Sequence, residues 1–224
     1  MRVVVLDPRE PLSAWCARND VPDALVGGFF VSATGVPLGE LWIGGRRLPT
    51  HSFVQPWAAV RSCLVIQDDR IGIVAGGRLP PAIGGDVLQA GPRLVSGGRA
   101  VVDPALDPEG FSAGRAQFDS DITVGRHPRA ALGLTPDRIL ALACDGRAGN
   151  EAGLTLTELA ELLIALGARE AINLDGGGST ALVSAGRLRN RPRAAMEEEI
   201  PGGRAISTAL VFAPRDAQAG ATRS

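Results

Sequence analysis

The sequence contains no lysine and no tyrosine, only two histidines, and three cysteines that lie far apart in the chain. Without lysine, the motif GxxxxGK[ST] cannot occur, so a P-loop NTPase is excluded. Three cysteines without a CxxC pair indicate neither a disulfide framework nor a zinc site. No apolar run reaches the roughly 18 residues of a membrane span, and the first run is too short for a signal-peptide core. We therefore expect a soluble, cytoplasmic protein, or a secreted one if a leader has been removed.

The overall charge offers little guidance to partners. The formal net charge is -1, which gives no reason to expect nucleic acid or an anionic membrane surface. Every basic side chain other than histidine is arginine, and the abundance of Ala, Gly and Pro points to GC-rich coding, so each arginine must be argued by itself. With 224 residues, 45% of them apolar, the chain predicts one domain over residues 1–214 and a flexible tail over 215–224.

The first half of the chain is dense in glycine and proline. Short apolar runs between these residues predict short strands joined by turns. Residues 103–126 have few periodic apolar positions and are predicted to form a long surface loop, of the kind that often carries function. The predicted strands cover residues 2–6, 24–31, 62–67, 71–77 and 87–95.

The second half is more regular. A predicted strand at 138–144 is followed by helical apolar spacing at 156–166 and by a second strand at 170–174. Thr155 with Glu158 fits a capping box, and Gly167 stands where the helix should end. Such a unit usually joins parallel strands by a right-handed crossover. We expect an α/β fold (α+β mixed) with a mixed sheet, a strand-helix-strand crossover at 138–174, and a last, antiparallel strand within 202–214.

Two aspartates stand where predicted strands end. Asp145 follows the strand at 138–144 and Asp175 follows the strand at 170–174. Strand ends on one rim of an α/β sheet are where ligands bind. An alternative for the lone "DG" at Asp145 is a simple turn in which the carboxylate binds backbone amides.

The stretch "NLDGGGST" has more special residues than a turn requires. Glycine allows a ligand to approach the backbone, and successive amides form an anion-binding nest. We expect this loop to bind phosphate or another oxyanion, the alternative being a glycine-rich turn without a ligand. The expected binding groups are Gly176, Gly177, Gly178, Ser179 and Thr180.

The order of several blocks resembles the phosphodiester glycosidase family over about residues 25–213. Related sequences often have Asn directly before the first pair of glycines, where this chain has Val26. The resemblance is carried by "GGFF" (27–30), "QAGPRLVSGGR" (89–99), "RHPRAALGLTPD" (126–137), "CDGR" (144–147), "GLTLTELAELLIALGAREAINLDGGGSTALV" (153–183) and "GGRAISTALVF" (202–212).

The resemblance implies a mixed α/β domain that removes a sugar, typically N-acetylglucosamine, from a phosphodiester joined to its anomeric oxygen. Phosphate is a weak base, so its departure requires anion stabilisation and a carboxylate more than a general acid. We expect Asp175 to be the catalytic carboxylate, Asp145 its partner, and Arg129 the catalytic arginine that contacts phosphate. Arg204 is the second choice for phosphate, and Arg147 is weaker because it also fits a solvent-facing turn.

The remaining expected substrate contacts come from the resembling blocks. His127 is either a general acid/base or a structural residue beside Pro128, and Phe29 either belongs to the core or stacks on a sugar ring. The second histidine, His51, lies outside these blocks. The contacts expected on this basis are Gly28, Phe29, Arg93 and His127.

Two other classes of function fit the same residues. A metal-dependent phosphoesterase would cut P–O instead of C–O, and a divalent cation between two aspartates and a phosphate is compatible with the sequence but not required by it. A binding module would hold glycosyl phosphates without turnover, and Val26 is the feature that favours it. We expect no cofactor and no metal, and a small glycosyl phosphodiester or nucleotide sugar as partner.

Overall fold

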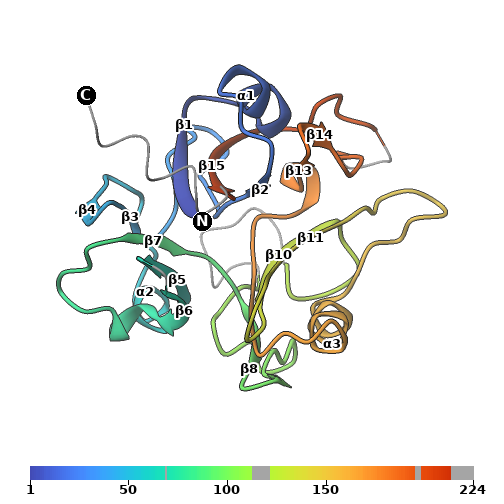
Figure 1. Ribbon diagram of the computed structural model, residues 1–224. Coiled ribbons are helices and arrows are strands. Elements are labelled where there is room, and N and C mark those ends of the chain that lie inside the picture. The colour runs from blue at the N-terminus through green and yellow to red at the C-terminus, as the bar shows by residue number, and fades with distance from the viewer. Residues whose placement is uncertain (69, 113–121, 195–197, 213–224) are drawn as a thin grey trace, which may run out of the picture.

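A computed structural model describes residues 1–68, 70–112, 122–194 and 198–212 of the chain. The fold is mostly β, with three five-stranded sheets in the described part. Figure 1 shows the first sheet at the top, the second at the lower left and the third at the lower right. This is an α+β fold, but every pair of strands described is antiparallel, so the expected mixed sheet is wrong.

The first sheet joins the two ends of the chain. Its strand order is β1-β15-β2-β13-β14, and β15 pairs antiparallel with β1 and β2, which confirms the predicted direction of the last strand. The β1–β15 register shifts between Val5 and Glu10, so the intervening residues leave the ladder. Helix α1 (Leu12–Arg18) follows β1 directly. The strands are β1 (Arg2–Pro11), β2 (Ala24–Val26), β13 (Leu182–Ser184), β14 (Arg187–Leu188) and β15 (Ala205–Val211).

The second sheet is built from the Gly- and Pro-rich first half, as predicted from its short apolar runs. Its order is β4-β3-β7-β5-β6. The predicted run at 62–67 coincides with β5, whereas the run at 87–95 divides into β7 and a strand of the third sheet. The elements are β3 (Leu41–Ile43), β4 (Arg46–Arg47), α2 (Trp57–Val60), β5 (Ser62–Gln67), β6 (Arg70–Ala75), the 3₁₀ turn η1 (Gly76–Arg78) and β7 (Asp86–Gln89).

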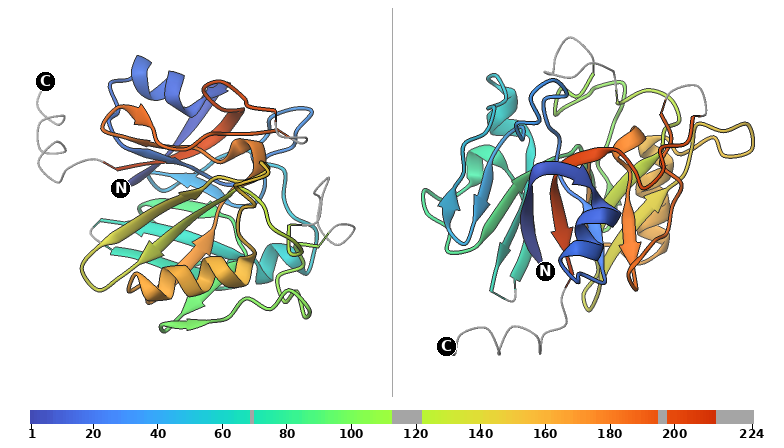
Figure 2. Two further views of the ribbon diagram at one scale, coloured as in Figure 1. Left: turned by 90° about the vertical axis from the view of Figure 1, so that its right-hand side faces the viewer. Right: turned by 90° about the horizontal axis from the view of Figure 1, so that it is seen from above.

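The third sheet has the order β11-β10-β12-β8-β9, and α3 (Leu156–Ala165) lies along one face of it, as Figure 2 shows. The predicted capping box is confirmed, because the Thr155 side chain accepts from the Glu158 amide while the Glu158 carboxylate accepts from the Thr155 amide. Gly167 follows the helix with φ +94°, as expected of a terminating glycine. The strands are β8 (Arg93–Ser96), β9 (Arg99–Ala100), β10 (Arg129–Leu134), β11 (Ile139–Cys144) and β12 (Glu170–Asn173).

The strand-helix-strand unit at 138–174 has its two strands, β11 and β12, parallel to each other but not adjacent, because β10 lies between them. β11 and β12 flank β10, and each pairs antiparallel with it rather than with the other. β10 and β11 are close in sequence and form a hairpin. β10 therefore occupies the place beside β11 that β12 would take if the two parallel strands were neighbours. The C-terminal ends of β11 and β12 still face the same edge of the sheet, because both strands run opposite to β10.

One core holds the three sheets together. Val3 and Leu210 of the first sheet, Leu64 of the second, and Leu132 and Ile172 of the third belong to the same buried cluster. The other face of the third sheet packs on α3 through a second cluster. Of the predicted loop at 103–126, the described residues contain no helix or strand, and residues 113–121 lie outside the described part, as does the predicted tail. None of the described helices combines the length and the apolarity that a bilayer crossing requires.

Candidate active site

A cavity of about 700 Å³ opens where the first and third sheets meet. Segments that follow β2 and β12 and segments that precede β10 and β15 form most of its wall. Antiparallel neighbours place the end of one strand beside the start of the next, which explains why segments far apart in sequence converge here. The lining residues are 29–32, 127–129, 173–179, 204–205, Arg9, Ile122 and Arg147.

Asp175 is the one carboxylate among the described residues that line the cavity. Burial raises its pKa from 3.8 to about 6, although the Ser179 hydroxyl, the charge of Arg204 and the Gly176 amide favour the ionised form. The Gly176 amide donates to Asp175 Oδ1 at 3.0 Å. The side chain is therefore ionised at neutral pH, yet more basic than an ordinary aspartate.

At each of the three glycines after Asp175, another group of the chain lies where a Cβ atom would be. A Cβ on Gly176 would lie 2.9 Å from the Pro128 carbonyl oxygen. Gly177 has φ +57°, and a Cβ there would lie 3.0 Å from a terminal nitrogen of Arg147. A Cβ on Gly178 would lie 2.9 Å from a terminal nitrogen of Arg204. The glycines therefore make room for two guanidinium groups of this chain.

The expected anion nest of amides is corrected by the hydrogen bonds of this loop. The Gly176 amide donates to the Asp175 carboxylate, and the Gly177 amide donates to the Pro128 carbonyl at 2.9 Å. The loop closes into the 3₁₀ turn η2 (Gly177–Ser179), in which the Ser179 and Thr180 amides donate to carbonyls of the same loop. These four amides are engaged within the protein, which leaves the Gly178 amide as the remaining member of the expected nest.

Arg147 and Arg204 supply the positive charge beside Asp175. Arg147 sits at φ +62°, and its Nη1 donates to the Arg193 carbonyl at 3.1 Å. Burial and the neighbouring charge of Arg204 lower the pKa of Arg147. Both side chains line the cavity, and neither has an ion pair to an acidic side chain in the described part of the chain. Two nearby guanidinium groups that form no ion pair are suited to binding an anion.

Arg129, the arginine expected to contact phosphate, lines the cavity, but its guanidinium is hydrogen-bonded to backbone carbonyls. Its guanidinium donates to the carbonyls of Leu154 at 3.0 Å, Ile122 at 2.9 Å and Gly125 at 3.3 Å. Only 3% of the residue is exposed, and burial lowers its pKa to about 10. These bonds tie two loops to the start of β10, which is a structural role.

Asp145 and Arg93 do not line the cavity. Asp145 Oδ1 accepts from the Arg191 amide at 2.6 Å, so its carboxylate anchors the chain near residue 191 instead of partnering Asp175. Arg93 is ion-paired with Glu170 of β12, and its amide donates to Glu109 Oε1 at 2.6 Å. The resemblance placed both in blocks near the site, but their side chains have partners elsewhere.

The other expected contacts divide into two groups. His127 and Ser179 line the cavity, as does Phe29, whose ring also packs against Phe111 at 5.7 Å between centroids. Gly28 and Thr180 do not line it: the Gly28 amide donates to Thr208 Oγ1 at 3.0 Å, and Thr180 is fully buried.

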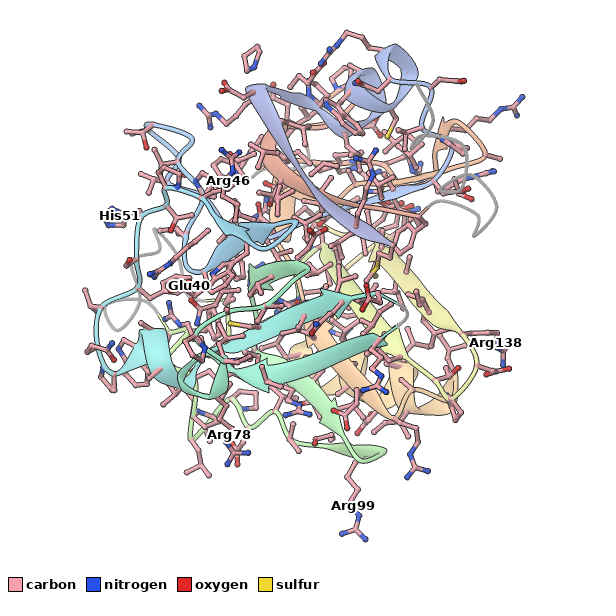
Figure 3. All side chains as sticks on the ribbon, turned by 60° about the vertical axis from the view of Figure 1, so that its left-hand side comes forward. Glu40, Arg46, His51, Arg78, Arg99 and Arg138 are labelled. Carbon is pink, nitrogen blue, oxygen red and sulfur yellow. The ribbon has the colours of Figure 1, made fainter. Side chains whose placement is uncertain are left out.

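Two positions that the sequence left in doubt lie away from the cavity wall. The second histidine, His51, is exposed and lies at the edge of the molecule (Figure 3). Val26, where relatives often have Asn, is a fully buried member of the main core.

Arg9 and Asn173 are among the lining residues that had no role assigned from the sequence. Arg9 lies in β1, far from every glycine-rich block, and no local pattern marks it. Asn173 immediately precedes the loop, and its Nδ2 donates to the carbonyls of Gly91 and Leu174 at 2.9 Å each. A polar residue inside an apolar strand was a usable signal for Asn173. Within the described residues, no three His, Cys, Asp or Glu side chains group as metal ligands.

Known structures share this fold. The chain aligns with the catalytic domain of zebrafish N-acetylglucosamine-1-phosphodiester alpha-N-acetylglucosaminidase, auto-inhibited by its pro-peptide, at a TM-score of 0.69 and 21% identity, covering 92% of this chain and 68% of that one. A hypothetical protein from Synechocystis aligns at a TM-score of 0.64 and 18% identity over 94% of this chain, which spans only 56% of that protein. A candidate exported protein from Burkholderia pseudomallei aligns at 0.67 and 18% identity, covering 95% of this chain and 71% of that one.

The sequence comparison agrees with the fold. Among curated proteins, none matches the sequence significantly. The model of the phosphodiester glycosidase family matches residues 21–213, which includes every lining residue except Arg9. The chain belongs to the phosphodiester glycosidase family.

Proposed function

We propose that this protein is a hydrolase that releases a sugar, of the N-acetylglucosamine type, from a sugar-1-phosphodiester by attack at the anomeric carbon. The observation that carries the proposal is Asp175, a carboxylate with a pKa of about 6 in a cavity that also contains the guanidinium groups of Arg147 and Arg204. Family membership supports the reaction class, and the name of the zebrafish relative supports the sugar.

The chemistry divides between the carboxylate and the arginines. The bond between the anomeric carbon and the phosphate oxygen breaks, and its electron pair leaves with the phosphate. Water supplies the new oxygen on the anomeric carbon, and the Asp175 carboxylate accepts its proton. A carboxylate with a pKa near 6 is a better base than an ordinary aspartate and is still mostly ionised at pH 7. Arg147 and Arg204 stabilise the charge on the departing phosphate.

Asp175 acts without a second carboxylate in this proposal. The two-carboxylate arrangement of ordinary glycosidases serves a leaving group that needs a proton from a general acid. A phosphate ester leaves as a stable anion, so the positive groups beside it replace the acid. Asp145, bonded to the Arg191 amide outside the cavity wall, then affects stability more than catalysis.

The first test measures the free sugar released from a panel of α-sugar-1-phosphodiesters that includes a nucleoside diphosphate sugar. The wild type is expected to release sugar. Asp175→Asn should lower kcat by about 10²- to 10⁴-fold while the protein stays folded, the usual effect of losing a general base. Asp145→Asn is the matched control and should keep kcat within a few-fold. Loss of activity in Asp145→Asn alone would reverse the two roles.

Oxygen-18 water distinguishes the competing reactions. Label in the released sugar means C–O cleavage, as proposed, whereas label in the phosphate means a phosphoesterase. Binding of the panel without any turnover means a binding module. The pH profile is a second check, because kcat/KM should fall below about pH 6 as Asp175 becomes protonated. A profile flat down to pH 4.5 contradicts the role of Asp175.

A further inference from the structure

Arg9 enters the cavity from outside the region that matches the family. The match begins at residue 21, whereas Arg9 lies in β1. The register shift between Val5 and Glu10 takes this part of β1 out of the ladder with β15. The side chain then lines the same cavity as Asp175. This chain therefore adds a cation that the family-matched part does not contain.

The loop after β2 is shaped around this guanidinium. Arg9 Cζ lies 5.3 Å from the centre of the Phe30 ring, in the geometry of a cation–π contact. Gly35 has φ +76°, and a Cβ there would lie 2.8 Å from Arg9 Cζ, so a larger residue would displace the side chain. The Gly35 carbonyl also accepts from the Ser207 hydroxyl of β15 at 2.7 Å. The Arg9 side chain is thus held in place by its surroundings.

The charge of Arg9 is not balanced by an acid. No ion pair joins Arg9 to a carboxylate in the described part of the chain. Its one hydrogen bond is long, from Nη1 to the Ser32 carbonyl at 3.4 Å. Among the described residues of the cavity wall there are four arginines and one carboxylate, and of the arginines only Arg129 is held by several backbone carbonyls. A phosphodiester brings one negative charge, so a ligand with a second negative charge matches this cavity better.

Arg9 and the pair Arg147–Arg204 occupy different parts of the wall. Arg147 and Arg204 contact the loop after β12, at Gly177 and Gly178. Arg9 contacts the loop after β2, at Phe30 and Gly35. Arg204 influences the pKa of both Asp175 and Arg147. An anion bound at Arg9 is therefore separate from the phosphate that leaves at the reaction centre.

We propose that Arg9 binds a second anionic group on the leaving side of the substrate, either the second phosphate of a diphosphate or a carboxylate next to the phosphodiester. The proposal rests on the function proposed above, because it assumes that the first phosphate binds at Arg147 and Arg204. Arg9 then selects doubly charged leaving groups and takes no part in bond cleavage. The guanidinium suits both candidates, since its planar fork matches phosphate and carboxylate alike.

The binding test needs no turnover. Inorganic phosphate and pyrophosphate are titrated by calorimetry into the wild type, Arg9→Gln, Arg9→Lys and Arg2→Gln. The control residue Arg2 is exposed, lies in the same strand and does not line the cavity. Pyrophosphate should bind the wild type about 10-fold more tightly than phosphate. Arg9→Gln should remove this advantage, Arg9→Lys should keep part of it, and Arg2→Gln should keep all of it.

The kinetic test uses substrates with the same sugar and different leaving groups: methyl phosphate, methyl diphosphate and carboxymethyl phosphate. Arg9→Gln should raise KM about 10-fold for the preferred doubly charged substrate, leave kcat nearly unchanged, and not affect the methyl phosphate substrate. The substrate that loses its advantage identifies the second anion as phosphate or carboxylate.

The proposal is overturned by equal KM changes for singly and doubly charged substrates, or by a pyrophosphate advantage that persists in Arg9→Gln. Absence of turnover with every substrate refutes the hydrolase but not the anion site, because the calorimetric comparison still decides the role of Arg9. If Arg9→Gln fails to fold, Arg9→Lys carries both comparisons. Loss of the pyrophosphate advantage in Arg2→Gln would mean a general charge effect and would also overturn the site.

Discussion

Replacing Asp175 with asparagine is expected to make the protein more stable while it removes activity. The carboxylate has a pKa of about 6 in the folded protein and 3.8 as the reference value, because burial disfavours its charge. Each pKa unit corresponds to about 1.36 kcal/mol, so the ionised group costs at most about 3 kcal/mol of folding stability at neutral pH. The side chain is partly open to the cavity, so we expect about 1 to 2 kcal/mol for Asp175→Asn.

The sign of this effect depends on pH in a defined way. A carboxyl group with a raised pKa in the folded state binds its proton more tightly there, so folding is favoured when the group is protonated. Below pH 3.8, both the folded and the unfolded states are protonated and the penalty is absent. The penalty grows between pH 3.8 and about 6, and it is complete above that value. Asp175→Asn should therefore stabilise the protein at pH 8 and lose that advantage at pH 3.5.

Urea denaturation at both pH values measures the difference directly, and thermal unfolding should show a rise of about 2 to 8 °C at pH 8. Asp145→Asn is the control, because the Asp145 carboxylate accepts a hydrogen bond from the Arg191 amide and its replacement gives no reason to expect stabilisation. A variant no more stable than the wild type at pH 8 would refute the reasoning. Equal stabilisation at pH 8 and pH 3.5 would also refute it, since the cause would then be packing.

Three further changes test other contacts. Gly178→Ala should displace the Arg204 guanidinium, which would lie 2.9 Å from the new Cβ, and weaken binding of inorganic phosphate by about 10-fold with little loss of stability, as calorimetry and thermal unfolding would show. Arg61→Met should cost about 3 to 5 kcal/mol in urea denaturation, because the fully buried guanidinium donates to the Glu109 and Gly110 carbonyls, which would lose their donor; a loss under 1 kcal/mol would contradict this. Thr155→Ala should cost about 1 kcal/mol, with a lower thermal midpoint, through loss of the cap of α3.

The parts of the fold predicted correctly are those determined by neighbouring residues. Helix α3 has its cap at Thr155, its apolar stripe and its terminating glycine within a few residues of one another. The strand β5 coincides with an uninterrupted apolar run. The position of β10 between β11 and β12 was not predictable in this way, because the apolar residues of β10 fit a parallel or an antiparallel neighbour equally well. The local residue pattern determines whether a segment forms a helix or a strand, whereas the order of strands in a sheet depends on contacts between segments far apart in the sequence.

The same limit applies to the site. Asp175 was identifiable because three glycines follow it, and unusual backbone leaves a local signature in sequence. Arg204 and Arg147 were named from the resembling blocks, as a second and a weaker choice for phosphate. Arg9 lies in no such block, and no local pattern distinguishes it from arginines such as Arg99 and Arg138, which point into solvent (Figure 3). Only the tertiary structure separates the two kinds.

The glycine loop and the arginines act together in a way that the loop alone does not reveal. If the loop bound phosphate through its amides, those of Gly176 and Gly177 would be open, but both are bonded within the protein. The missing Cβ atoms instead allow Arg147 and Arg204 to lie against the turn that contains Asp175. In the proposed reaction, the two guanidinium groups and the Asp175 carboxylate then face the same leaving group. Arginine suits this position better than lysine, because a flat guanidinium fits against a bare backbone and still presents paired donors to phosphate.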